Sequence, residues 1–416
     1  MLASYCSSEH HFKDMSRRKH RSLNDRIQGG GGFGPQQSLG PNWTQSSTQQ
    51  PKDNDGGIRI NDENEKLKAM INILSNKNKA LSEENKSLRA SMQGNKVGRD
   101  SSRKGRKQSM VYHEISPAVT PNDILLAGLL YAGFEPSRLQ KNNNKRKIGW
   151  FKSFYGVEPT TVAPYFLDIK EKYPDIKYKD CLLTMNWAYL YDTQPVLSAR
   201  WKYCEEYIGD KVIEYGMKMA KVGMMKITYE LKHKVKLGRT VDCSTFMCFE
   251  MRLDPSTEWF DYKTHSAGLK YEFCLATREP KICHISGPHV PSKHDITVFR
   301  GGDADQKEED RDQSALYFKV EDDERLIGDA GYSGEPTKVV VTRDEQSSEF
   351  KEFLARAKNR QETFHWRLKS FNILGHRFRH GVNTKERMRM HRMAVELVAG
   401  IVQYDYENGH PPFDIC

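Results

Sequence analysis

The sequence lacks the features of a secreted or membrane-spanning protein. It has no N-terminal apolar segment of the signal-peptide type, and its longest apolar run, starting at Ile124, is shorter than the roughly 20 residues that cross a bilayer. Its eight cysteines include no CxxC pair, so neither a disulfide framework nor a zinc ribbon is indicated. These absences predict a soluble, unsecreted protein with free thiols and no membrane partner.

Large apolar residues are also scarce at the beginning of the chain. Residues 1–58 are rich in Gly, Ser, Gln, Asn and charge, and they include a run of four glycines. Such a composition buries too little surface to offset the entropy of ordering, so we expect a disordered tail. Positive charge is abundant instead. A formal net charge of +10 and a pI of about 9.0 favour a polyanionic partner such as nucleic acid.

Residues 59–93 carry a heptad repeat. An apolar residue recurs every seven positions, which is typical of the d positions of a leucine zipper. Asn78 falls at position a, where a buried amide is satisfied by its counterpart in a parallel partner. The repeat predicts a short coiled coil that forms a homodimer, although a solvated single helix would have the same pattern. The d positions are Leu67, Leu74, Leu81 and Leu88.

Basic clusters flank the heptads at residues 17–21 and 102–107, the second within a basic linker at 94–114. Each fits a nuclear import signal, a loose phosphate contact or a solvated charge run. We therefore expect a nuclear protein. A glycine tract separates the upstream cluster from the heptads, so the continuous basic helix of a bZIP factor is missing.

Residues 115–231 have a helical pattern. A helix before Gly156 and a second one opened by Pro159 have the outline of a helix-turn-helix, whose second helix would enter a DNA groove. A plain helical bundle shows the same outline. If the motif binds DNA, the candidate contacts are Thr160 and Thr161 on the second helix and Lys145, Arg146 and Lys147 in the preceding basic segment.

The pattern changes in residues 232–416. Segments rich in β-branched and aromatic residues alternate with period two, and helical segments follow, the longest from about 347 to 371. This order indicates a mixed α/β domain, in which a mixed sheet is flanked by helices.

Three carboxylates stand out in this domain. Asp242 lies inside the first strand, Asp329 closes a later strand, and Glu362 lies on the long helix. Taken singly, each has a simpler explanation, such as a turn cap or a solvated helix position. Three carboxylates meeting within about 4 Å would repel by roughly 4 kcal/mol per pair, so they would require cations. Two Mg²⁺ or Mn²⁺ ions suit oxygen ligands and clamp the attacking and leaving oxygens of a phosphodiester.

The same residues carry a family resemblance. The segments TVDCS, WFDYK, GLKYEF, PSKHDITVF, LIGDAGYSG, RQETFHWRLKSF and the C-terminal AVELVAGIVQYDYENGHPPFDI resemble the Harbinger-type transposases of the DDE superfamily, which are related to bacterial insertion-sequence transposases. The resemblance covers residues 115–416 and is most specific in the second half. The sequence departs from the family pattern at two places: DCS replaces DGT after the first strand, and residues 303–312 form an acidic insertion.

The resemblance implies an RNase H-like fold with a DDE triad of Asp242, Asp329 and Glu362. Glu362 follows Asp329 by 33 residues, which suits the compact second spacing of the family. His294 and Asp295 match its HD pair near the metal site, so Asp295 is a further candidate ligand. Lys263 and Lys270 match basic positions that contact phosphate. A Myb-like helper protein is also implied.

Positive charge dominates the C-terminal helices. The segment from Thr363 to Gly400 contains eight Lys or Arg residues and two Glu residues. Lys369 lies seven residues after Glu362, hence on about the same helix face, where it would neutralise a phosphate, and Arg367 is a further candidate DNA contact. These features together predict a metal-dependent DNA transposase that acts on double-stranded DNA. The alternatives are a domesticated sequence-specific nuclease and a non-catalytic, zipper-dimerised DNA-binding regulator.

Overall fold

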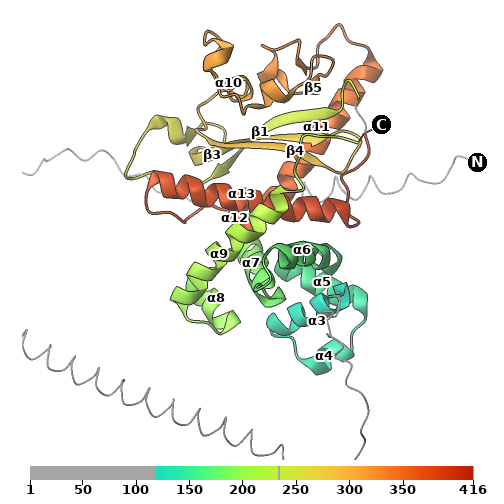
Figure 1. Ribbon diagram of the computed structural model, residues 1–416, viewed down its shortest axis with the longest axis vertical. Coiled ribbons are helices and arrows are strands. Elements are labelled where there is room, and N and C mark those ends of the chain that lie inside the picture. The colour runs from blue at the N-terminus through green and yellow to red at the C-terminus, as the bar shows by residue number, and fades with distance from the viewer. Residues whose placement is uncertain (1–118, 233–234, 416) are drawn as a thin grey trace, which may run out of the picture. The chain divides into compact units, whose positions relative to one another are not determined.

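The computed structural model describes residues 119–232 and 235–415, which belong to one compact unit (Figure 1). The predicted tail, coiled coil and basic linker lie outside these residues, and so do the heptad positions Leu67, Leu74, Asn78, Leu81 and Leu88. No helix in the two described ranges is both long and apolar enough to cross a membrane.

Helices fill the region before the sheet, as their capping residues predict. Thr120 caps the first helix through a capping box with Asp123, and Gly156 ends α5 with φ 81°. α6 continues through Pro164. The helices are α3 (Pro121–Tyr131), α4 (Pro136–Gln140), α5 (Asn144–Tyr155), α6 (Pro159–Lys172), α7 (Tyr178–Leu190), α8 (Gln194–Trp201) and α9 (Glu205–Met224).

The sheet is mixed and has the strand order β2-β3-β1-β5-β6, with β4 also paired to β3. β3 runs antiparallel to β1, β2 and β4, whereas β1, β5 and β6 run parallel to one another. The strands are β1 (Arg239–Met247), β2 (Phe260–Asp261), β3 (Ser266–Ala276), β4 (Ile282–His289), β5 (Leu326–Ile327) and β6 (Val339–Val340). β1 therefore occupies a central position between an antiparallel and a parallel neighbour.

The two faces of this sheet bury different side chains, because successive residues of a strand point to opposite faces. Phe273 and Leu275 of β3 join the core that includes α11 (Ser348–Lys369) and α13 (Thr384–Glu407). Cys274 and Ala276 join a smaller core beneath α10 (Asp295–Arg300). Figure 1 shows α13 and α10 on opposite sides of the sheet. Asp242, like Phe246 on the same strand, faces the α11 side.

One long helix connects the helical region to the sheet. α13 packs against α9 and α6 and also against β4, and the short α12 (Asn372–Gly375) precedes it. Gly223 of α9 and Gly400 of α13 cross so closely that a Cβ on Gly223 would lie 2.6 Å from the Gly400 Cα. Two glycines thus permit direct backbone contact between these helices.

Candidate active site

Asp242 and Asp329 are brought together by strand pairing. β1 and β5 pair in parallel with Arg239 opposite Leu326 and Thr240 opposite Ile327. Continuing this register by two residues places Asp242 beside Asp329, just beyond the end of the short β5. Asp329 caps a 3₁₀ turn there, and its Oδ1 accepts a hydrogen bond from the Gly331 N–H at 2.9 Å. The aspartate thus closes its strand as the sequence predicts.

Glu362 reaches Asp242 from α11, the helix on that face of the sheet. The Thr240 hydroxyl donates to Gln361 Oε1 at 2.6 Å and the Gln361 amide donates to the Phe273 carbonyl, which fixes the helix on β1 and β3. Asp242, Glu362 and His365 each offer a ligand atom within 4.8 Å of the other two. His365 was not predicted from the sequence, although it lies three residues after Glu362 and therefore on the same helix face.

Asp295 joins the group from the opposite side of the sheet. It lies in the first turn of α10, and a Cβ added to Gly331 would be 3.0 Å from Asp329 Oδ1 and 3.5 Å from Asp295 Oδ2. The glycine thus fits between two carboxylates. Lys270, a predicted DNA contact, instead donates to Asp295 Oδ1 at 2.9 Å and to the Lys293 carbonyl. His294 precedes α10 and is exposed.

The electrostatics of Asp242 show that these acids converge. Burial and, in decreasing order, the charges of Asp329, Glu362 and Asp295 together raise the pKa of Asp242 to about 7. A carboxylate that resists ionisation beside three others is stabilised by a cation. The structure therefore brings together the three predicted acids and the predicted Asp295.

Two predicted lysines border this cluster. Burial and the charge of Lys263 lower the pKa of Lys369, while Glu362, Asp242 and Asp261 oppose that shift. Burial and the same two lysines lower the pKa of His365 to about 3, so its imidazole is neutral at physiological pH. Lys263 and Lys369 consequently place positive charge near the acids, and their contact with phosphate stays a prediction.

Glu272 is a second buried acid that the sequence analysis missed. It faces the α10 side of β3, is fully buried, and is paired in register with Cys243 of β1. Burial raises its pKa to about 8, with a contribution from Asp295, and the Tyr332 hydroxyl opposes the shift without reaching hydrogen-bond geometry. The only sequence signal is a second charge, two residues after Lys270, in a strand of mostly apolar residues.

The donor set fits a divalent cation. Carboxylate oxygens and a neutral imidazole nitrogen are ligands of Mn²⁺ and related ions, and oxygen ligands also suit Mg²⁺. His365 Nδ1 lies 3.6 Å from Asp242 Oδ2, which is too long for a hydrogen bond, and its buried Nε2 has no partner among the described residues. Asp242, Glu362 and His365 would hold such an ion, and its positive charge would relieve the repulsion among the acids.

The predicted DNA contacts fall into two groups. Thr160, Lys145 and Arg146 are exposed and Lys147 is half-buried, so these side chains are accessible. Two others are corrections. Thr161 is fully buried and donates to Asp405 Oδ1 at 2.8 Å, and Arg367 pairs with Asp405 at 3.5 Å and donates to the His410 carbonyl at 2.7 Å.

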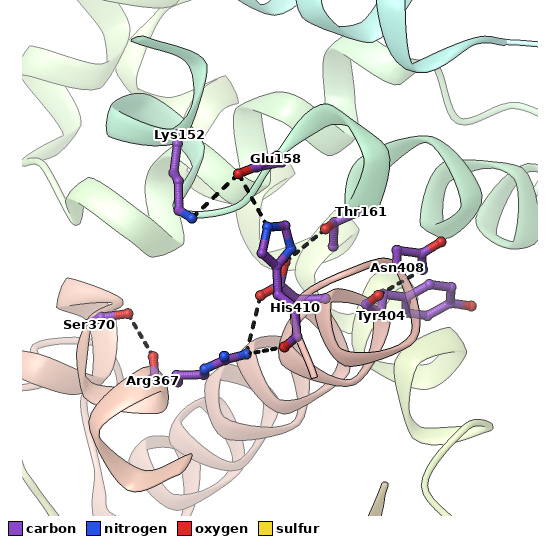
Figure 2. Close-up of polar contacts among 9 residues, drawn as sticks. Lys152, Glu158, Thr161, Arg367, Ser370, Tyr404, Asn408 and His410 are labelled. Atoms are coloured by element: carbon purple, nitrogen blue, oxygen red, sulfur yellow. Dashed lines mark hydrogen bonds and ion pairs between the residues drawn. The ribbon is translucent and has the colours of Figure 1, made fainter. Parts of the chain in front are cut away.

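Figure 2 shows that Thr161 and Arg367 belong to a polar cluster between α6 and the ends of α11 and α13. His410 contacts Glu158 at 3.2 Å and Asp405 at 3.0 Å within it. The prediction failed because these partners lie far away in the sequence. Thr161 is buried at the junction between helical region and sheet and cannot face DNA, and Arg367 is half-buried there with its guanidinium bound to Asp405 and to the His410 carbonyl.

Residues 241–403 also match a known family. A family model described as DDE superfamily endonuclease covers residues 241–403, a range that begins one residue before Asp242 and includes Asp329 and Glu362. The chain has no match among curated proteins and none among solved structures. Residues 241–403 are therefore similar to the DDE superfamily endonucleases, and this similarity supports a DDE-type transposase family for the chain.

Proposed function

We propose that the protein is a metal-dependent DNA transposase of the Harbinger type that cuts and joins DNA strands. The observation that carries the proposal is the convergence of Asp242, Asp329 and Glu362 from β1, the end of β5 and α11; burial and the charges of the neighbouring acids raise the pKa of Asp242 to about 7. The position of β1 between antiparallel β3 and parallel β5 supports an RNase H-like arrangement. The match to endonucleases supports phosphodiester chemistry.

In this proposal Asp242, Asp329 and Glu362 hold two Mg²⁺ or Mn²⁺ ions, with Asp295 and His365 as further donors. Ions bound there would stabilise the negative charge that develops on the attacking and leaving oxygens. Water is the nucleophile for cleavage, and the freed 3′-hydroxyl is the nucleophile for joining. Lys263 and Lys369 neutralise the phosphate beside the acids.

The remaining parts of the proposal concern assembly and location. Double-stranded DNA is the substrate, contacted in part by Thr160, Lys145, Arg146 and Lys147. The heptads of residues 59–93 would form a homodimer, and the basic clusters would direct the protein to the nucleus. A Myb-like helper protein would assist, as the family resemblance implies.

The direct test replaces Asp242 with Asn, which removes one negative ligand and keeps the side-chain volume. With DNA carrying the candidate ends of its element, we expect Mg²⁺-dependent cleavage to fall by at least about a hundredfold. DNA binding and the melting temperature should not fall. Asp303→Asn, in the exposed acidic loop, is the matched control and should cleave normally. Nicking by the Asp242 variant at the normal rate in Mg²⁺ would refute the assignment.

A further inference from the structure

A pocket of about 1010 Å³ opens beyond the C-terminal end of β1. Its walls come from residues 248–260, from the start of β3, and from the segment between α12 and α13. Four arginines line it, and we call it the arginine pocket: Arg252, Arg377, Arg379 and Arg387. It is separate from the acid cluster, and Glu250 is the single acidic residue among its lining residues in the described part of the chain.

The guanidinium groups of two of these arginines are already hydrogen-bonded to backbone carbonyls. Arg387 donates to the carbonyls of Phe249 and Glu250, and Arg379 donates to the carbonyl of Tyr191. Arg252 and Arg377 are exposed and, within residues 119–232 and 235–415, their side chains have no hydrogen bond or ion pair. Two guanidinium groups are thus available to an anion, and they suit phosphate because of their fork of donors.

Aromatic rings lie beside these charges. Phe249 is 48% exposed and Phe260 is 36% exposed, and both line the pocket. Trp259 forms its floor, where the indole N–H donates to the Asp254 carbonyl at 3.1 Å. Exposed rings next to unpaired arginines are the combination that binds unpaired bases by stacking and their phosphates by charge.

The pocket is within reach of DNA held at the acid cluster. Cys248 follows Asp242 by six residues of nearly continuous strand, which is about 20 Å, the rise of roughly six base pairs of duplex DNA and at most as many unpaired nucleotides. Lys263 follows β2, the strand that contributes Phe260, and its charge acts on Lys369 and His365. Basic residues therefore connect the two sites.

We propose that the arginine pocket binds unpaired nucleotides of a DNA strand whose neighbouring phosphodiester lies at the acid cluster, a role that rests on the proposed function. Arg252 and Arg377 hold the phosphates, and Phe249 stacks on a base. The ligand class is single-stranded DNA at a duplex end, because paired bases would not expose a face to these rings.

The test measures binding of the full-length protein, in Ca²⁺ to prevent cleavage, to a blunt duplex and to the same duplex with a single-stranded extension of about six nucleotides at either end. Arg252→Glu/Arg377→Glu should weaken binding of the extended duplex by at least about tenfold and reduce its salt dependence. Phe249→Ala should weaken the same complex by about tenfold. Neither variant should change binding of the blunt duplex by more than about twofold.

Lys307→Glu/Arg343→Glu is the matched control, because it makes the same change in net charge on exposed residues outside the pocket. Arg252→Gln/Arg377→Gln repeats the test with a milder substitution if the charge reversal lowers the melting temperature. Equal losses on both DNAs, or no loss with either double variant, would overturn the proposal. Binding is measured without cleavage, so the two experiments are independent. A negative result for the arginine pocket does not affect the Asp242→Asn cleavage test, and a protein that does not cleave DNA can still be tested for binding.

Discussion

At the scale of single residues, the acid cluster has a nitrogen donor in addition to its oxygens. Glu362 and His365 occupy one face of α11, and the imidazole is kept neutral by burial and by Lys369 and Lys263. A neutral imidazole has one unprotonated ring nitrogen, and in the tautomer that leaves Nδ1 unprotonated this nitrogen faces Asp242 and can bind a metal ion. On the proposed function, His365 would extend the metals that the site accepts towards Mn²⁺.

His365→Phe should therefore weaken Mn²⁺ binding by about 10- to 100-fold. The free ion can be followed by electron paramagnetic resonance, and the nitrogen coupling to bound Mn²⁺ should disappear. His380→Phe is the control, because His380 is also largely buried, but among Trp187, Tyr191 and Phe378. A nitrogen coupling that persists in the His365 variant would contradict this role.

At the scale of elements, the sequence predicts what local patterns determine. Thr120 and Asp123 mark the start of α3, and the helices predicted around Asp295 and Glu362 are confirmed as α10 and α11. β5 and β6 have two residues each, too few for a periodic pattern, so the pairing of β5 with β1 and of β6 with β5 cannot be derived from composition.

In the candidate site too, the residues marked by a local sequence pattern could be predicted, and those whose role depends on tertiary contacts could not. The three acids could be found because each lies at a characteristic place on a strand or helix. Thr161 and Arg367 were misassigned because Asp405, their shared partner, is brought to them by the tertiary fold. Glu272 was missed because nothing in the sequence shows that its strand is buried on both faces.

The crossing of α9 and α13 offers a test at this scale. Gly400→Ala should destabilise the protein by about 1–3 kcal/mol, because the added methyl group would lie 2.8 Å from the Gly223 Cα and the helices must separate. Chemical denaturation measures the change. Gly149→Ala, on α5 with open space around it, should be neutral or stabilising by up to about 1 kcal/mol. Equal effects of the two variants would show that the close crossing is unimportant for stability.

At the scale of the whole molecule, buried histidines link stability to pH. Burial lowers the pKa of His391 to about 3 and also lowers that of four others, so these groups stay neutral in the folded protein. The four are His284, His289, His365 and His380. Below about pH 6.5 the unfolded chain gains protons that the folded chain does not, so stability is lost as pH falls.

Asp242 and Glu272 act in the opposite direction, because their raised pKa values favour the folded state at low pH. Comparing the unchanged protein with a variant at one histidine cancels the contribution of Asp242 and Glu272 to the pH dependence, because both proteins contain these acids. His391→Gln keeps a partner for the Tyr271 hydroxyl, 2.9 Å from His391 Nδ1, and should reduce the pH dependence of the unfolding free energy by about 1.4 kcal/mol per pH unit between pH 6 and 4. Urea unfolding at several pH values measures it. The exposed His294→Gln should leave the dependence unchanged, and an unchanged slope in the His391 variant would contradict the buried neutral state.

The position of α13 also restricts how chains of this kind can diversify. One side of this helix packs on the sheet at β4, and the other side packs on α9 and α6. The helical region and the sheet region therefore each need α13 to cover their apolar side chains. An exchange of gene segments near residue 232 would leave apolar side chains such as Leu397 and Val398 facing a foreign neighbour. On the proposed function, new DNA specificities would accordingly arise by substitution on exposed helix faces, with the helical region and the DDE-like region inherited together.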